Sequence, residues 1–227
     1  MRRVKATLVA LLLVAGHVPI AVAQPIGPVA GRLELAAGLL WAGGQPLGSR
    51  DANLTTGTGA TLRLFSTTSE LAAAAGFEAR VGVRVTRAFD VEASASYGTP
   101  ELRTRVSNDL ENTTGATPSE SVKQYTVGAG VLWYAPLRKS SSRVRPFVIG
   151  GAAYLRQLHE AATLVATGQT YQIGGGAKVL LASRTRKTIK AAGVRLDARA
   201  IVRTKGIAFD GRRSISPAAG ASLFVRF

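Results

Sequence analysis

Charged side chains that alternate with apolar ones are the residues of this chain best suited to chemistry. In the run Arg195-Leu196-Asp197-Ala198-Arg199, an acid stands between two bases at intervals of two. Successive side chains of a β-strand point to opposite faces, so this spacing puts all three charges on one face. Such faces predict a network of ion pairs. The candidate members are Glu34, Glu78, Arg80, Arg84, Glu92, Lys178, Arg195, Asp197, Arg199, Arg203 and Arg226.

A catalytic or metal-binding reading finds little support in the sequence. His159-Glu160 does not begin a zinc-binding H-E-x-x-H motif, because position 163 is threonine. No serine stands beside His159 as a partner for nucleophilic catalysis. Gly174-Gly175-Gly176 lies inside an alternating segment with no helix start after it, which favours close packing over a phosphate-binding loop. We therefore expect no catalytic residue, no metal ligand and no cofactor.

Eight segments have the two-residue periodicity of β-strands, and polar or turn-like stretches separate them. The clearest lies near the end of the chain, where Val194, Leu196 and Ala198 alternate with charged residues. The predicted strands are 31–41, 72–86, 89–97, 124–134, 145–156, 170–181, 191–203 and 217–227. The second and third are separated by a few residues around Arg87, which predicts an antiparallel hairpin.

The fifth predicted strand is ambiguous because both of its faces are largely apolar. A bulge near Gly150-Gly151 would fit the glycine pair. We expect one set of this strand's side chains to point outward, like the apolar faces of the other strands: Phe147, Ile149, Gly151, Ala153 and Leu155.

The links between the predicted strands alternate in length. Those after the first, third, fifth and seventh strands are long and polar, whereas those after the second, fourth and sixth are shorter. Long loops at one end and short turns at the other are typical of barrels that cross outer membranes. The four long links are 42–71, 98–123, 157–169 and 204–214, and residues 57–65 within the first predict a small hairpin.

A soluble sandwich and a membrane barrel differ in which side of the sheet is apolar. A soluble sheet buries its apolar face and rarely its charges, whereas a lipid-embedded barrel turns the apolar face outward around a polar interior. Apolar-face residues such as Ala93, Ala129 and Ala198 are too small to fill a soluble core well. We therefore expect an all-β, eight-stranded antiparallel transmembrane barrel with up-and-down connections. Aromatic residues near strand ends would form its interfacial belts: Trp41, Phe89, Tyr97, Tyr125, Trp133, Tyr171 and Phe227.

The N-terminal residues 1–23 have the features of a secretory signal peptide. A positively charged start and a short apolar core precede the small-x-small site Ala21-Val22-Ala23, so we expect cleavage between Ala23 and Gln24. A short lead over 24–30 would then precede a barrel over 31–227. The net charge is +16, but most bases alternate singly with apolar residues. This arrangement does not suit a nucleic-acid-binding patch.

The last strand resembles the C-terminal strand of bacterial outer-membrane β-barrels, with Gly220, Leu223 and Val225 before a terminal Phe227. With the signal peptide, the eight segments and the loop lengths, the mature chain resembles the small barrels of the OmpA-like, OmpX-like and OmpW-like, porin-like superfamily. The resemblance implies the outer membrane of a Gram-negative type of cell, lipid contacts and a monomer. It also implies that the barrel assembly machinery reads the last strand.

The predicted interior leaves two functions open. An eight-stranded barrel is just wide enough for side chains to fill, so paired charges would plug it. The protein would then have a structural or surface-interaction role through long extracellular loops. Alternatively, the excess of bases would line a narrow passage for small anionic or apolar solutes. The resemblance also implies a minor alternative, an outer-membrane lipid-modifying enzyme. Such enzymes have a His-Ser-Glu type of site, and this chain does not match it, because the residue two after His159 is Ala161.

Two of the shorter links are strongly basic and contain no acid. They predict either solvated charge clusters or contacts with anionic lipid headgroups on the periplasmic leaflet. The residues are Arg138, Lys139, Arg143 and Arg145 in one link and Arg184, Arg186, Lys187 and Lys190 in the other.

Overall fold

The computed structural model describes residues 33–57, 59–107, 118–135, 143–159, 165–183, 188–205 and 213–227. In this part of the chain no helix is long and apolar enough to span a membrane. The predicted signal peptide, its cleavage site and the 24–30 lead lie outside the described residues, as do most of the two basic links. The strands are β1 (Leu33–Ala42), β2 (Gln45–Thr55), β3 (Thr61–Leu71), β4 (Ala74–Arg84), β5 (Phe89–Gly98), β6 (Glu101–Ser107), β7 (Ser119–Tyr134), β8 (Val144–His159), β9 (Val165–Ser183), β10 (Ala191–Lys205) and β11 (Ser214–Arg226).

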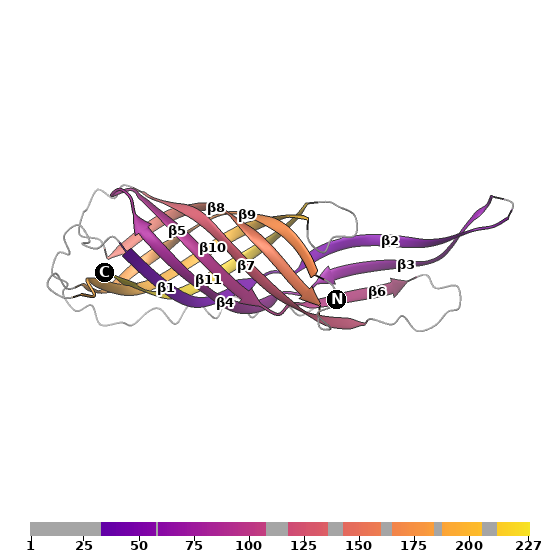
Figure 1. The fold of residues 1–227 in the computed structure, drawn as a ribbon, viewed down its shortest axis with the longest axis horizontal. Helices are drawn as coiled ribbons and strands as arrows, with labels where there is room; N and C mark the ends of the chain where they lie inside the picture. The colour runs from indigo at the N-terminus through magenta and orange to yellow at the C-terminus, as the bar shows by residue number, and fades with distance from the viewer. Residues whose placement is uncertain are drawn as a thin grey trace, which may run out of the picture.

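Eight of these strands close into an antiparallel barrel. The order around it is β1-β4-β5-β7-β8-β9-β10-β11, and pairing of β11 with β1 completes the ring. These are the eight strands predicted from the sequence, and the meander of sequence neighbours is the predicted topology (Figure 1). We call the end where β1 begins and β11 ends the terminal end, and the opposite end the extended end.

The outer wall of the barrel is apolar on nearly every strand, as predicted. Val127 on β7 is 61% exposed and Leu223 on β11 is 67% exposed, although both are aliphatic. Aromatic side chains lie near both ends of this wall. Phe89 is in register with Trp133 near the terminal end. Near the extended end the rings of Tyr97 and Tyr125 lie 5.1 Å apart, so the wall has the two aromatic belts of an outer-membrane barrel.

The predicted orientation of the fifth strand, β8, is wrong. Phe147 and Ile149 are 3% and 1% exposed and point into the lumen, whereas Val148 faces outward. Phe147 pairs in register with Gly176 on β9, and Ile149 with Gly174. These glycines leave lumenal space that bulky β8 side chains fill, and the buried cluster also contains Leu132 and Tyr134. The register of β8 continues through Gly150-Gly151 on both sides, so the predicted bulge is absent.

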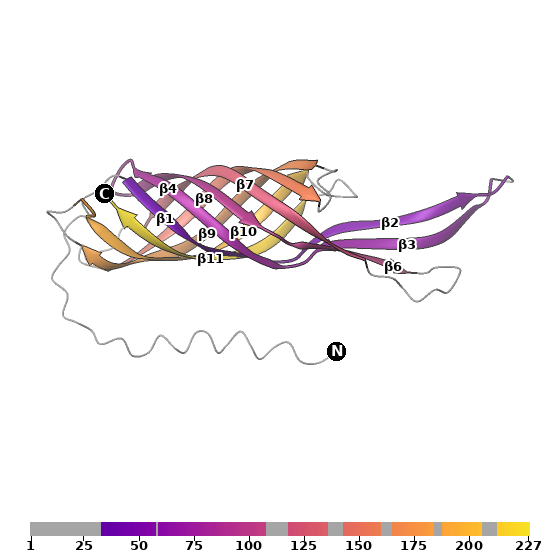
Figure 2. The ribbon, with the colours of Figure 1, turned by 60° about the horizontal axis from the view of Figure 1, so that its bottom comes forward.

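The links at the extended end contain more regular structure than the sequence predicted. β2 and β3 form a hairpin whose last paired residues are Thr55 and Thr61, and β6 adds a third strand to it. The hairpin predicted over 57–65 is therefore present but much longer. Figures 1 and 2 show these strands projecting well beyond the barrel. We call β2, β3 and β6 the extension.

An apolar cluster joins the base of the extension to the barrel. Leu47, Leu71 and Leu102 from the extension pack with Val122 of β7, and all four side chains are buried. The predicted long link over 157–169 is wrong, because β8 runs to His159 and β9 begins at Val165. In the described part of the chain, the first two predicted long links, 42–71 and 98–123, therefore contain the strands of the extension.

Candidate functional site

The lumen of the barrel holds all the predicted charged residues but Arg203 in two layers of ion pairs. The upper layer is centred on Arg195, whose side chain is 0% exposed. Arg195 donates from Nη1 and Nη2 to the two carboxylate oxygens of Glu92, at 2.6 and 3.2 Å. β10 and β5 lie four places apart in a ring of eight strands, so this bidentate pair spans the lumen from wall to wall.

Asp197 contacts three bases of the upper layer. It accepts hydrogen bonds from Arg195 at 3.0 Å and from Arg199 at 2.5 Å, and its Oδ1 lies 3.3 Å from Arg80. Glu78 pairs with Arg80 and accepts two hydrogen bonds from Arg199, at 2.7 and 3.0 Å. One carboxylate therefore serves several guanidinium groups, and the charges of opposite sign lie interleaved.

The lower layer lies nearer the terminal end. Glu34 accepts hydrogen bonds from Lys178 and Arg226, both at 2.6 Å. Asp90 lies 3.7 Å from Lys178 and accepts a 2.5 Å hydrogen bond from the hydroxyl of Tyr134. Arg84 lies 3.3 Å from the same carboxylate. Asp90 alternates with Phe89 and Val91 and was predicted on the polar face of its strand, but it was not among the predicted members of the charge network.

Arg203 is the predicted member that the structure places outside both layers. Its side chain lies nearer the extended end of the lumen and donates from Nη1 to the amide oxygen of Gln45. The amide nitrogen of Gln45 donates to the hydroxyl of Ser214 at 2.5 Å. Sequence reasoning missed Gln45 because it fell within a predicted loop, where no periodicity gives the direction of a side chain.

The residues weighed for enzyme chemistry are not gathered into a site. Nδ1 of His159 lies 3.0 Å from a carboxylate oxygen of Glu120 on the neighbouring strand, and Glu160 is outside the described residues. Side chains at Gly174 and Gly176 would collide with the backbone of β10, so these glycines permit close strand packing. Among the described residues no group of three or more His, Cys, Asp or Glu could hold a metal ion. The absence of an enzyme activity stays a prediction.

The four residues predicted as the assembly signal lie on β11 and at the end of the chain. Leu223 and Val225 point to the outer wall, and the backbone nitrogen of Phe227 donates to the carbonyl of Leu33 at 2.9 Å. Gly220 faces the lumen against Asp197 and Arg199, where a Cβ atom would lie 3.2 Å from both side chains. The last strand therefore closes the barrel, and its recognition by assembly machinery stays a prediction.

Comparison with solved structures identifies the architecture. The Neisserial surface protein A (NspA) matches with a TM-score of 0.50 at 13% identity, over 86% of this chain and 97% of that one. The fold is that of the small outer-membrane β-barrels. OprG from Pseudomonas aeruginosa (TM-score 0.49, 11% identity, 88% of this chain and 98% of that one) and Ail of Yersinia pestis (0.36, 11%, 86% and 98%) were also found. No protein-family model and no curated protein matches the chain.

An outer-membrane barrel of this kind explains the distribution of side chains. A closed barrel satisfies every ladder hydrogen bond internally, which is what a spanning sheet must do in lipid. The apolar outer wall with its aromatic belts and the charged lumen complete the pattern. The protein is therefore an outer-membrane protein with buried charged residues, as the sequence predicted.

Proposed function

We propose that this outer-membrane barrel is closed to solutes and acts through its extension, as a structural or surface-interaction protein. The observation that carries the proposal is the ion pair between Arg195 and Glu92, which joins opposite walls of the lumen. Arg199 and Glu78 form a second pair across strands three places apart. Paired charges that fill a narrow barrel leave no continuous water path through this layer.

The extension supplies the surface. It projects beyond the barrel (Figure 2). Leu54 and Leu62 are exposed and pair with one another next to the last pair of its β2–β3 hairpin. The charged pairs Arg63–Asp51 and Arg103–Glu101 are also largely exposed on it. An open edge of β2 borders this surface, since β2 is the last strand of the sheet on that side. Such a protruding three-stranded sheet is suited to contact with molecules outside the cell.

Conductance in planar bilayers tests the closed lumen. We expect no steady current from the wild-type protein, and a clear current from a variant in which Glu92, Arg195, Glu34 and Lys178 are all replaced by serine, so that side chains of both layers are shortened. A steady wild-type current would refute the plug and favour the narrow-pore alternative. The variant serves as the positive control, because it shows that the inserted barrels are present and detectable.

Proteolysis of intact cells tests the direction of the extension. Trypsin should cut at Arg50 and Arg63, which are exposed on β2 and β3, while the barrel strands stay protected in the membrane. Cleavage that occurs only after the outer membrane has been opened would place the extension in the periplasm and overturn a surface role. The assembly machinery, the lipid contacts and the monomeric state remain predictions that neither experiment addresses.

A further inference from the structure

Arg203 is a buried cation that lacks a carboxylate partner in the described part of the chain. The residue is 6% exposed, its Nη1 donates to the amide oxygen of Gln45, and its Nε has no hydrogen-bond partner. The other buried bases of the lumen each lie within 3.3 Å of at least one carboxylate oxygen. Because an uncompensated buried charge is strongly disfavoured, Arg203 is a position that an anion would stabilise.

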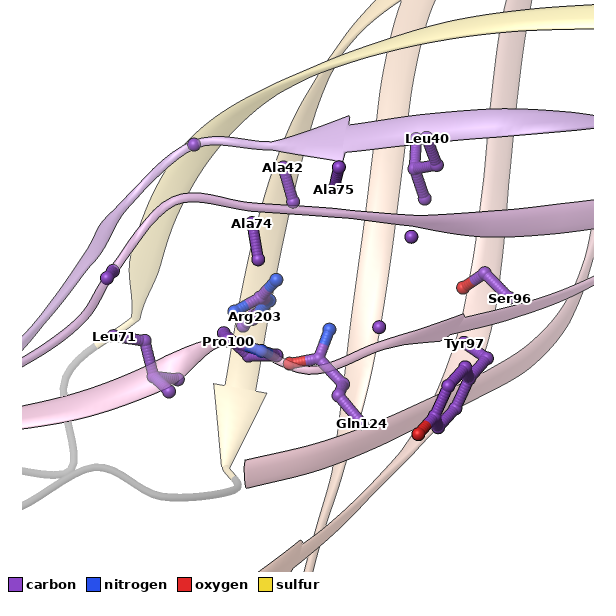
Figure 3. Close-up of a pocket in the computed structure, with 14 residues that line it drawn as sticks. Leu40, Ala42, Leu71, Ala74, Ala75, Ser96, Tyr97, Pro100, Gln124 and Arg203 are labelled. Carbon is purple, nitrogen blue, oxygen red and sulfur yellow. The ribbon is translucent and has the colours of Figure 1, made fainter. Parts of the chain in front are cut away.

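A cavity adjoins this guanidinium group beneath the base of the extension. Its volume is about 40 Å³, several times the smallest space that holds one water molecule. Figure 3 shows Arg203 reaching into the region between Ala74 and Pro100, with the amide of Gln124 on the same side. Most of the lining is apolar, from Leu40, Ala42, Leu71, Ala72, Ala74, Ala75 and Pro100.

A second hydrogen-bond donor faces the same cavity. The amide oxygen of Gln124 accepts a hydrogen bond from Gln157 at 3.2 Å, which turns the amide nitrogen of Gln124 to other partners. Gln45 is fixed in turn by Ser214, so that its oxygen and not its nitrogen points to Arg203. The site thus offers the Arg203 cation, the amide of Gln124, the hydroxyl of Ser96 and a largely apolar wall within a small volume.

We propose that this cavity is a binding site for a short-chain monocarboxylate such as propionate. The carboxylate accepts hydrogen bonds from Arg203 and from the amide nitrogen of Gln124, and the alkyl group lies against Leu40 and Ala74. A single charge matches the single unpaired cation, and the apolar wall favours an alkyl tail over a fully hydrated anion such as phosphate. The site lies above the ion-pair layers, so binding does not depend on passage through the lumen.

Calorimetric titration of the folded protein in detergent, in chloride-free buffer, tests the proposal. Propionate should bind saturably, and propionamide, the neutral ligand of the same shape, should bind at least about tenfold more weakly because it lacks the charge. Equal binding of the two ligands, tighter binding of inorganic phosphate, or no saturable binding of propionate would each overturn the assignment.

Three variants locate the site. Arg203→Met should lose propionate binding, whereas Arg156→Met, at the same end of the barrel but exposed on the outer wall, should keep it. Ala74→Phe fills the cavity without removing the charge and should weaken binding at least about tenfold. Heat-modifiable gel migration shows that each variant is folded. Unchanged binding in Arg203→Met refutes the proposal, and if that variant does not fold, unchanged binding in Ala74→Phe refutes it.

Discussion

Removal of Glu92 should destabilise the barrel far more than removal of an exposed acid. In wild type, the side chain of Arg195 makes three hydrogen bonds, two to Glu92 and one to Asp197. Glu92→Leu leaves only the bond to Asp197, which Arg199 and Arg80 already share. A buried charge that loses its main partner costs about 3–5 kcal/mol. At about 1.4 kcal/mol per factor of ten, the folding equilibrium falls between about a hundredfold and a few thousandfold.

A double variant separates the loss of a partner from the loss of a residue. In Glu92→Leu with Arg195→Leu no unpaired charge remains, so stability should return to within about 2 kcal/mol of wild type. The matched control is Glu101→Leu on the extension, where both members of the pair with Arg103 are about half exposed. That change should cost no more than about 1 kcal/mol.

Urea unfolding in lipid vesicles measures these differences, with the fluorescence of the two lipid-facing tryptophans, Trp41 and Trp133, as the signal. The reasoning fails if Glu92→Leu costs no more than Glu101→Leu. It fails equally if the double variant is as unstable as the single one, because the penalty would then come from lost packing and not from an unpaired guanidinium group.

Two further predictions concern the wall of the barrel. Ala129→Arg places a charge on the lipid face of β7 midway between Tyr125 and Trp133 and should cost about 2–4 kcal/mol in the same unfolding assay, whereas Leu54→Arg on the extension should change stability by no more than about 0.5 kcal/mol; equal costs would contradict a lipid-facing wall. Gly176→Val should lower the yield of the heat-modifiable folded form severely, because a Cβ atom there lies 2.7 Å from that of Asp197. Gly57→Val, with no atom within 4 Å of such a Cβ, is the control, and an equal yield for both would refute the close-packing argument.

Periodicity predicted the barrel because the same alternation determines the strand, its two faces and the position of its charges. For seven of the eight barrel strands, periodicity predicted which face points to the lipid. In runs such as Arg195 to Arg199 the choice is clear, because only one face is free of charges. β8 was misread because Phe147 and Val148 are both apolar, and the choice between them depends on volume. Gly174 and Gly176 on the neighbouring strand decide that choice, and register between strands is not visible in a single sequence.

The extension was only partly predicted for a related reason. Its strands contain polar residues on both faces over much of their length, as in Ser49 to Asn53 and Ser66 to Ser69. Outside lipid there is no requirement for an unbroken apolar stripe, so the period-two signal is weak. The contact between Arg203 and Gln45 could not be predicted, because it joins a barrel strand to the first residue of β2.

The balance of buried charges connects the closed lumen with the anion site. The described residues include five buried acids and six buried bases, and the acids are shared so that five of the bases have carboxylate partners. Sharing is possible because acids and bases alternate within each layer. Asp197, for example, contacts three arginines. Arg203 lies nearer the extended end than either layer and donates a hydrogen bond to the amide oxygen of Gln45 instead. The buried base without a carboxylate partner among the described residues therefore lies above both layers, so an anion bound to it leaves the ion pairs below intact.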